Sequence, residues 1–374
     1  MLNFPEELVI EILSRLPAKS LGKFKCVSKS WLALISTQRF IKTHLSIASG
    51  RDDYEHHRLV FKVSPFSSDG ANYELHSVSS LLHGPASETT TVEVFDLDCR
   101  LSPTNSLFFV GSCNGLLCIF HMRNEVFYLH NPCTTKLKGL PDSGIHRGYG
   151  ICRNFGFGYV RCSDDYKVLG LFKILIESLN GPVSFKYEFR LYSLKNNSWR
   201  KIEDLKIGIP KLEFLDNFKF ASENLHWLVD DGIDGLRIGR FDLANETYQV
   251  MDCPNNKDSL YDHGLGVLGG CLSLFYDRER THADIWIMKD YGIEESWTKV
   301  FSIPYIDTPG DRLFEMAQSI CTSRNGEMLF ILGSKLLLYD PKSNTLTQFP
   351  QIGIFFRMIM YVESLVWPDI HDLE

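Results

Sequence analysis

The sequence of 374 residues lacks the patterns that mark several common classes of protein. No apolar stretch is long enough to cross a membrane, since even Leu107–Phe120 and Met328–Leu338 are short and interrupted by turn residues or a lysine. No basic segment followed by an apolar one opens the chain, so we expect no secretory signal. C-x-x-C, P-loop and H-E-x-x-H motifs do not occur, so the chain lacks these three patterns of metal and nucleotide-phosphate sites.

Positive charge is not in excess either. Lys and Arg total 39 against 46 Asp and Glu, so the formal net charge is −7. Nucleic-acid binding through the whole surface needs clustered Lys and Arg, and we therefore expect no nucleic-acid partner and no membrane partner. The ten cysteines are scattered along the chain. Without a secretory signal we expect reduced thiols and a location in the cytoplasm, the nucleus or both.

The first 47 residues are basic and helical in pattern, unlike the rest of the chain. They contain seven Lys and Arg against three carboxylates, a local charge of +4. Apolar residues recur at helical spacing over residues 8–16, Pro17 ends this helix, and Ser28 is placed to cap a later one. A segment of about 45 residues cannot bury this much apolar surface alone. Two interpretations stay open: a helical cap packed on the rest of the chain, or a docking module with an apolar face for another protein.

The stretch Phe4–Leu45, FPEELVIEILSRLPAKSLGKFKCVSKSWLALISTQRFIKTHL, resembles an F-box. The Ile-Leu, Leu-Pro, Lys-Ser-Leu and Val-x-Lys-x-Trp elements of that family occur at matching spacing, with departures at Phe4 and Gly22. The resemblance implies binding to a Skp-type adaptor and, through it, to a cullin. The residues predicted to contact the adaptor are Pro5, Leu8, Ile12, Leu13, Leu16, Pro17, Leu21, Val27 and Trp31.

The predicted contact surface follows from helical geometry. Leu8, Ile12 and Leu16 are expected to share one face of the first helix. Pro17 and Leu21 are expected to continue that surface past the end of the helix. For Trp31 two alternatives stay open, a place at the adaptor or a place in the core of the module.

From residue 59 onward, short β-rich runs alternate with Gly, Asn, Asp and Pro turns, and a unit of strands recurs. Five corresponding turns lie near Asn131, Lys195, Ala244, Asp290 and Pro341, at successive spacings of 64, 49, 46 and 51 residues. A repeat near 50 residues with four strands predicts a β-propeller rather than a β-sandwich with long loops.

A sixth unit is expected from strands at both ends of this region. The early strands at residues 59–63 and 73–78 would join the closing run at 355–366 in one blade, which closes the ring and removes open sheet edges. We predict six blades, with seven as the alternative.

The same region resembles the plant F-box-associated, kelch-like domain. The motifs GSCNGLLCI, LYSLKNNSWRKI, RFDLANETYQVMDCP and YVESLV occur in the order of that family. The predicted fold is therefore a small all-α helical F-box module followed by an all-β kelch-like β-propeller. The expected organisation is an F-box at residues 1–47, a linker at 48–58, the propeller at 59–368 and a tail at 369–374.

Two motifs imitate active sites. GLGVLG at Gly264–Gly269 matches a dinucleotide fingerprint, but a strand follows it where such a site needs a helix. GSCNG at Gly111–Gly115 places Cys113 as if it were a nucleophile, yet Asn114-Gly115 favours a hairpin turn. We predict turns at both motifs, and we expect no catalytic, cofactor-binding or metal-binding residues.

The resemblance implies a non-catalytic, substrate-recognition subunit of a Skp–cullin–F-box ubiquitin ligase. Its propeller loops would bind a target protein for ubiquitination and proteasomal degradation. Two alternatives stay open: a propeller outside any ligase that sequesters a protein or small ligand, and a propeller enzyme. Immune-receptor turnover and self-incompatibility are both roles within the family, and the target and the loops that bind it stay open too.

Overall fold

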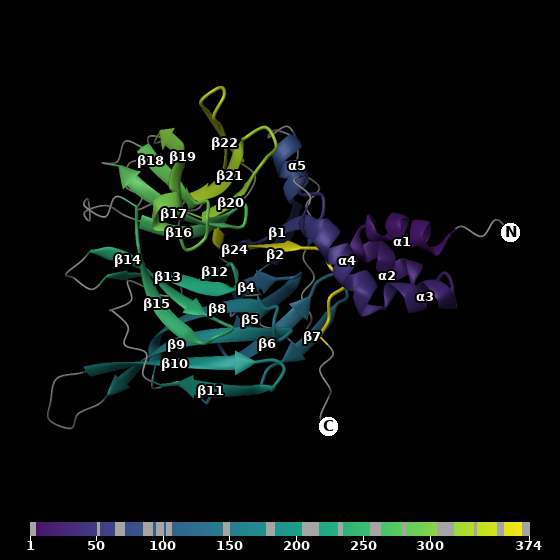
Figure 1. Cartoon of the computed structure of the whole chain (residues 1–374), viewed down its shortest axis with the longest axis horizontal. Coiled ribbons are helices and arrows are strands. Elements are labelled where there is room, and N and C mark those ends of the chain that lie inside the picture. Colours follow the sequence, from purple (N-terminus) through teal and green to yellow (C-terminus); the bar gives the residue numbers. More distant parts are fainter. Residues whose placement is uncertain are drawn as a thin grey trace. The chain divides into compact units, whose positions relative to one another are not determined.

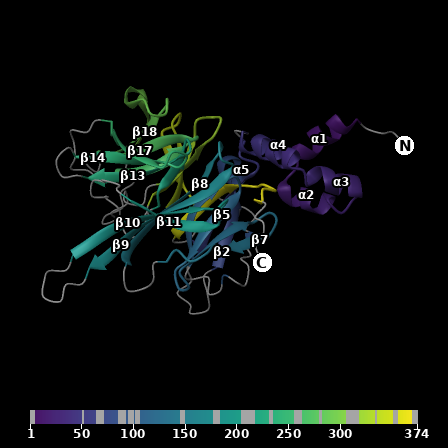
Figure 2. The ribbon, with the colours of Figure 1, turned by 60° about the horizontal axis from the view of Figure 1, so that its bottom comes forward.

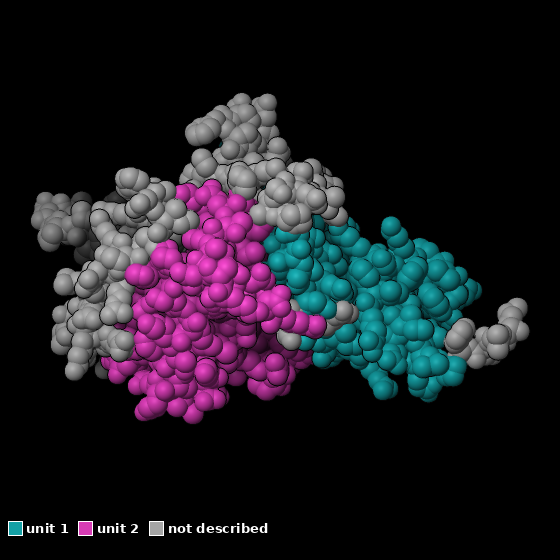
Figure 3. Space-filling view, turned by 90° about the horizontal axis from the view of Figure 1, so that it is seen from above, with its two compact units in different colours: residues 1–140, 356–374 teal, residues 141–355 magenta. Residues whose placement is uncertain are grey.

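The computed structural model describes residues 5–50, 53–63, 72–84, 93–94, 101, 107–144, 150–176, 184–203, 217–230, 235–254, 263–278, 282–304, 318–332, 335–349 and 355–368. Four helices come first and β-strands follow (Figures 1 and 2). The chain separates into unit 1, residues 1–140 with 356–374, and unit 2, residues 141–355 (Figure 3). In the described ranges, no helix has the length and apolar character needed to cross a membrane.

Unit 1 begins with the helices α1 (Glu6–Ser14), α2 (Ala18–Phe24), α3 (Lys29–Ile35) and α4 (Gln38–Ser49). Proline precedes α1 and α2, where its missing N–H costs no helical hydrogen bond. The predicted cap of α3 is confirmed, because the Ser28 hydroxyl accepts the Trp31 backbone N–H at 3.1 Å. Thr37 caps α4 in the same way, through the Phe40 backbone N–H at 3.2 Å.

The segment expected to be a linker, residues 48–58, begins within helix α4 and ends within strand β1. Helix α4 continues to Ser49, beyond the expected boundary at residue 47. His56 is buried, and strand β1 begins at His57. The expected tail, residues 369–374, lies outside the described residues.

Two four-stranded sheets belong to unit 1, apart from Phe355 at the start of β24. Sheet A has the order β24 (Phe355–Val362), β1 (His57–Val63), β2 (Asn72–Ser77), β3 (Glu93–Val94). Sheet B has the order β4 (Leu107–Cys113), β5 (Leu116–His121), β6 (Val126–Asn131), β7 (Lys136–Gly139). A short helix, α5 (Val78–His83), follows β2, so the strand expected to reach residue 78 ends one residue earlier.

Unit 2 holds four further sheets of four strands each. Sheet C consists of β8 (Gly150–Val160), β9 (Asp165–Ile176), β10 (Ser184–Ser193) and β11 (Ser198–Ile202). Sheet D consists of β12 (Lys219–Ala221), β13 (Asn224–Asp230), β14 (Leu236–Asp242) and β15 (Thr247–Asp252). Sheet E consists of β16 (His263–Leu268), β17 (Cys271–Arg278), β18 (His282–Met288) and β19 (Trp297–Pro304), with the short 3-10 helix η3 (Glu294–Ser296) before β19. Sheet F consists of β20 (Gln318–Thr322), β21 (Met328–Leu332), β22 (Lys335–Asp340) and β23 (Thr345–Gln348).

The sheets confirm the predicted six blades rather than seven for the described part of the chain. Neighbouring strands with a described register are antiparallel, as in the hairpin of β13 and β14. The expected joining of strands from both ends is also confirmed, because β24 is hydrogen-bonded to β1 in sheet A. This pairing gives β1 a hydrogen-bonded neighbour on both sides, β24 and β2, and leaves β24 as the edge strand of the sheet.

The turn between the third and fourth strands has a common construction in three sheets. The side chain of its first residue accepts backbone N–H groups that follow: this residue is Asn131, Asp242 or Asp340. The residue four positions later has a φ of 54–59°: Thr135, Glu246 or Asn344. A short acceptor side chain at the start of a turn is a local feature of sequence, and this explains why the repeat was visible without the structure.

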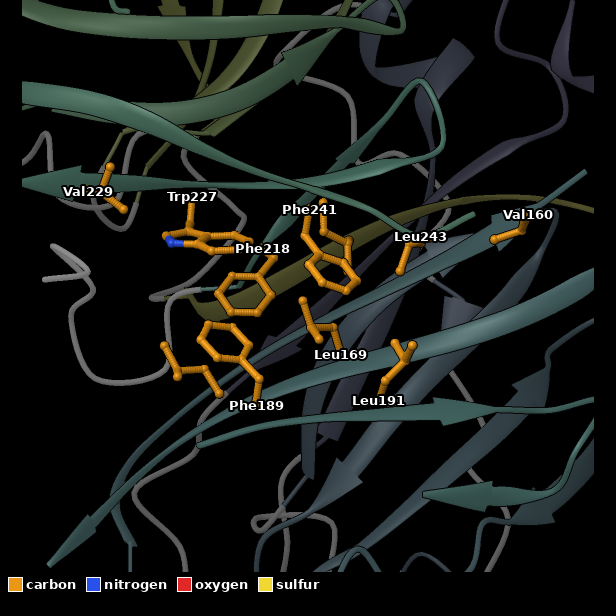
Figure 4. Packing of buried hydrophobic residues seen from close by; sticks show 11 residues of the cluster. Val160, Leu169, Phe189, Leu191, Phe218, Trp227, Val229, Phe241 and Leu243 are labelled. Carbon is orange, nitrogen blue, oxygen red and sulfur yellow. The ribbon is translucent and has the colours of Figure 1, made fainter. Parts of the chain in front are cut away.

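The largest buried side chains of unit 2 include a cluster from sheets C and D (Figure 4). Trp227 is 1% exposed, with its ring 4.6 Å from that of Phe218 and 5.8 Å from that of Phe189. A Cβ at Gly239 would lie 2.9 Å from the Trp227 ring, so the indole needs a glycine on the neighbouring strand. Trp297 is also buried, whereas Trp199 and Trp286 are half-buried.

His226 in β13 is a buried titratable group of unit 2. Its Nε2 lies 2.7 Å from the Tyr291 hydroxyl, and its Nδ1 lies 3.1 Å from the Lys219 carbonyl oxygen. Because a carbonyl only accepts, Nδ1 carries the proton and Nε2 accepts from Tyr291. Burial, with the nearby Arg240 charge, lowers the pKa of His226 to about 4.

This pKa predicts a loss of stability in acid. The unfolded chain binds a proton near pH 6.5, whereas the folded protein binds it near pH 4. The contribution of His226 is therefore complete above pH 6.5 and falls by about 2 kcal/mol between pH 7.5 and 5. Urea unfolding at these two pH values should show a smaller pH dependence for His226→Gln than for the wild type. An equal pH dependence in both proteins would contradict the assignment.

Candidate functional site

Exposed apolar side chains concentrate on the four helices of unit 1. Six large hydrophobic side chains of the described residues are exposed, and two of them, Tyr187 and Ile293, lie in unit 2. The other four, with exposed fractions of 46, 58, 61 and 47%, are Leu8, Ile12, Val27 and Leu32. We call these four residues the exposed apolar set. They lie within residues 8–32, so this short segment has more exposed large hydrophobic side chains than its length would account for.

The inner sides of the same helices form a small core. Leu13, Leu21, Ile35 and Phe40 are buried there, together with Leu365 from the segment after β24. Successive helical residues point in different directions, so Leu13 faces inward while Ile12 beside it faces outward. The helices therefore complete their core with one residue from the far end of the chain and still leave an apolar outer surface.

The nine residues predicted to contact an adaptor fall into three groups by exposure. Pro5, Leu8, Ile12, Pro17 and Val27 are exposed, Leu16 and Trp31 are half-buried, and Leu13 and Leu21 are buried. The expectation that Leu13 and Leu21 lie on the surface is wrong for this structure, because both belong to the core of the helices. An adaptor contact for the other seven stays a prediction.

Leu16 does not continue the face of Leu8 and Ile12 as expected. Helix α1 ends at Ser14, and Leu16 lies beyond it, packed against the core. The carbonyl oxygen of Leu16 lies 2.9 Å from Nε2 of the buried His44, which further fixes this turn. Trp31 packs edge-on against Phe24, with ring centroids 5.7 Å apart, and this contact favours the core alternative for its ring.

The prediction from sequence missed Leu32, the fourth member of the exposed apolar set. Trp31 and Ile35 are one turn apart and face the core of the helices. Leu32 is displaced by about 100° around α3 from Trp31, which turns it away from that core. Helical spacing could therefore have identified Leu32 once Trp31 was placed inward.

Positive charge accompanies the exposed apolar set. The exposed residues of α2 include Lys19 and Lys23. Burial and the charge of Lys136 on β7 lower the pKa of Lys25, the residue that follows α2. The ion pair of Glu11 with Arg15 is exposed on both sides, at 2.9 Å, and contributes little to stability. An acidic partner would complement this surface.

The turn predicted at GSCNG is confirmed, whereas the turn predicted at GLGVLG is wrong for most of that motif, which lies in a strand. Cys113 pairs with Leu116 across the β4–β5 hairpin, and Asn114 and Gly115 between them have φ of 54° and 82°. Strand β16 contains most of GLGVLG and passes through a two-glycine turn into β17, without a helix. Among the described residues, no group of three His, Cys, Asp or Glu side chains is placed to hold a metal ion.

Known proteins resemble both parts of the chain. The model of the F-box domain matches residues 1–43, and that of the F-box associated beta propeller domain matches residues 71–367. The F-box protein CPR1 of Arabidopsis thaliana is 32% identical over 327 residues, which cover 81% of this chain and 73% of that protein. An F-box/kelch-repeat protein of the same plant is 29% identical over 304 residues, 81% of this chain and 80% of that protein. The four helices are thus an F-box, the six sheets are propeller blades, and the chain belongs to the F-box proteins with an F-box-associated β-propeller domain.

Proposed function

We propose that this protein is the substrate-recognition subunit of a Skp–cullin–F-box ubiquitin ligase. The F-box binds a Skp-type adaptor and, through it, a cullin, while the propeller binds the protein to be ubiquitinated and degraded. The observation that supports this most is the exposed apolar set, which gives the F-box four of the six exposed large hydrophobic side chains in the described residues. Apolar surface that a module leaves uncovered is typical of a protein interface.

The chain itself performs no chemistry in this proposal. F-box proteins are in general non-catalytic adaptor subunits, and the ubiquitin comes from other subunits of the ligase. The contribution of this chain is proximity, because it holds the target and the charged enzyme in one assembly. Burial raises the pKa of the Cys133 and Cys321 thiols to about 12, so these two thiols stay protonated at neutral pH.

We assign recognition of the target protein to the loops between the blade strands. Loops can change in sequence while the blades keep their hydrogen bonding and their core. We expect the protein to act in the cytoplasm, the nucleus or both, where reducing conditions keep its cysteines as thiols.

Co-purification tests the proposal directly. The full chain, expressed with a Skp-type adaptor and a cullin, is expected to elute from size-exclusion chromatography as a stoichiometric three-protein complex. The same preparation without the adaptor is the control, and the cullin should then elute separately. A full chain that elutes alone in the presence of both partners would remove the ligase role and favour a propeller that sequesters its ligand.

A further inference from the structure

The segment that follows β24 connects the propeller to the F-box. We call residues 363–366 the strap. The backbone N–H of Glu363 donates to the His56 carbonyl oxygen at 2.7 Å, and the buried Glu363 carboxylate pairs with Arg58 at 3.1 Å. The hydroxyl of the buried Ser364 donates to the carbonyl oxygen of Asn114 at 2.7 Å, in the turn between β4 and β5. The strap is thus tied both to the entry of β1 and to sheet B.

Asn131, at the end of β6, holds the strap from the side of sheet B. Its Nδ2 donates to the carbonyl oxygens of Ser364 at 3.1 Å and Val366 at 2.7 Å. Its Oδ1 accepts the backbone N–H groups of Cys133 and Thr134, and so starts the turn before β7.

The residue type at this position distinguishes sheet B from sheets D and F. The corresponding turns begin with Asp242 and Asp340, whose carboxylates also accept backbone N–H groups. An aspartate would serve the turn of sheet B equally well, but it could not donate to the strap. The amide of Asn131 is therefore explained by the strap and not by the turn.

Gly115 allows the strap to approach the β4–β5 turn. A Cβ at this position would lie 2.2 Å from the Ser364 hydroxyl oxygen and 2.6 Å from the Val362 carbonyl oxygen. Neither distance is possible without a shift of the strap, and the φ of 82° also favours glycine.

Leu365 is the residue of the strap that reaches the F-box. It is buried in the same cluster as Leu13, Leu21 and Phe40, with Cys133 of the turn between β6 and β7 packed against that cluster. One short segment therefore continues the strand that closes the ring, contacts sheet B and fills the F-box core. A flexible tether would make no such contacts.

We propose that the strap fixes the orientation of the F-box on the blade formed by β4–β7, with Asn131 and Leu365 as positioning residues. This inference rests on the proposed function: in a ligase, a fixed F-box keeps the bound target at a constant distance from the charged enzyme. Loss of the strap contacts leaves the adaptor surface intact and removes its fixed orientation. Ubiquitin transfer then depends on a broad distribution of distances and becomes slower.

Amide hydrogen exchange of the full chain tests the positioning role. Asn131→Asp keeps the acceptor of the turn and removes both donors to the strap. We expect amides of the strap, α2 and α4 to exchange at least about tenfold faster, because two hydrogen bonds to the strap are lost, one buried and one partly buried. Strands β4–β6 should keep wild-type exchange. The matched control is the reverse substitution at the corresponding turn of sheet F, Asp340→Asn. It should leave the hydrogen exchange rates of the F-box amides unchanged.

A second pair of variants examines the F-box end of the strap. Leu365→Ser removes the apolar contact and should raise exchange in α2 and α4, whereas Leu365→Met keeps a side chain of similar volume and should restore protection. Faster exchange of the strap with wild-type exchange in the F-box would overturn the proposal. Uniformly faster exchange over all of unit 1 would also overturn it, since the strap would then be only a source of overall stability.

Adaptor binding by the same samples separates this inference from the proposed function. Asn131→Asp is expected to bind the adaptor with wild-type affinity, because no residue of the exposed apolar set is changed. A wild-type protein that binds no adaptor would count against the ligase role. We expect the combination of wild-type adaptor affinity with faster hydrogen exchange in α2 and α4.

Discussion

Replacing Leu8 and Ile12 together by aspartate is expected to lower the affinity of the F-box for its adaptor by about 100- to 1000-fold. Both side chains are exposed, one helical turn apart on α1. A buried apolar anchor is worth about 2 kcal/mol when truncated, and a carboxylate left in the interface adds an unpaired charge. Two such changes correspond to about 4 kcal/mol, which is about 1000-fold. Isothermal titration of the adaptor into each purified variant measures the difference.

Ile293→Asp is the matched control for this experiment. Ile293 is exposed to 52%, close to the 58% of Ile12, and lies in unit 2 instead of the F-box. It should bind the adaptor as the wild type does. Equal affinity of the Leu8/Ile12 variant and the control would remove the docking role of α1. Leu16→Asp with Pro17→Ala is a less specific variant, because Leu16 packs on the core of the helices.

Trp227→Ala is expected to lower the free energy of unfolding by about 3–5 kcal/mol. The indole is almost fully buried, and its ring is 5.5 Å from that of Tyr248 as well as close to Phe218. Its removal leaves a cavity among residues of sheets C and D (Figure 4). Since the total stability of a domain is about 5–15 kcal/mol, the loss should be visible as a large shift of the urea midpoint.

Trp199→Ala provides the comparison. Trp199 is half-buried, and its Nε1 donates to the Pro141 carbonyl oxygen at 2.8 Å. We expect a loss of about 1–2 kcal/mol, from partial burial and one hydrogen bond. Similar midpoints for the two variants would show that the cluster around Trp227 does not dominate the stability of these blades.

The propeller could be predicted because its signals are local. The turns that begin at Asn131, Asp242 and Asp340 each combine an acceptor side chain with a positive φ four residues later. The number of blades was predicted from the spacing of the turns. The pairing of β1 with a strand from the end of the region was predicted because an unpaired sheet edge is unfavourable. The hairpin at Asn114-Gly115 was likewise predicted from two residues.

The candidate site was predicted less completely because burial depends on distant residues. Nothing near Leu21 in the sequence indicates that Leu365 lies against the same core. The end of α1 at Ser14 was also not predicted, and it decides that Leu16 turns away from Leu8 and Ile12. The strap was unpredictable for the same reason, since Ser364 of the strap and its partner Asn131 are 233 positions apart in the sequence.

The pairing of β1 with β24 has a consequence for synthesis on the ribosome. Strand β1 emerges long before β24 has been translated. Until then the backbone groups of β1 that pair with β24 have no partner in the sheet. A nascent chain arrested before residue 355 would carry the F-box sequence with an unsealed first blade and without the leucine that completes the helical core. Such a fragment would offer the unpaired edge of β1 to other chains or to chaperones, so translation past residue 355 is needed before the first blade can be completed.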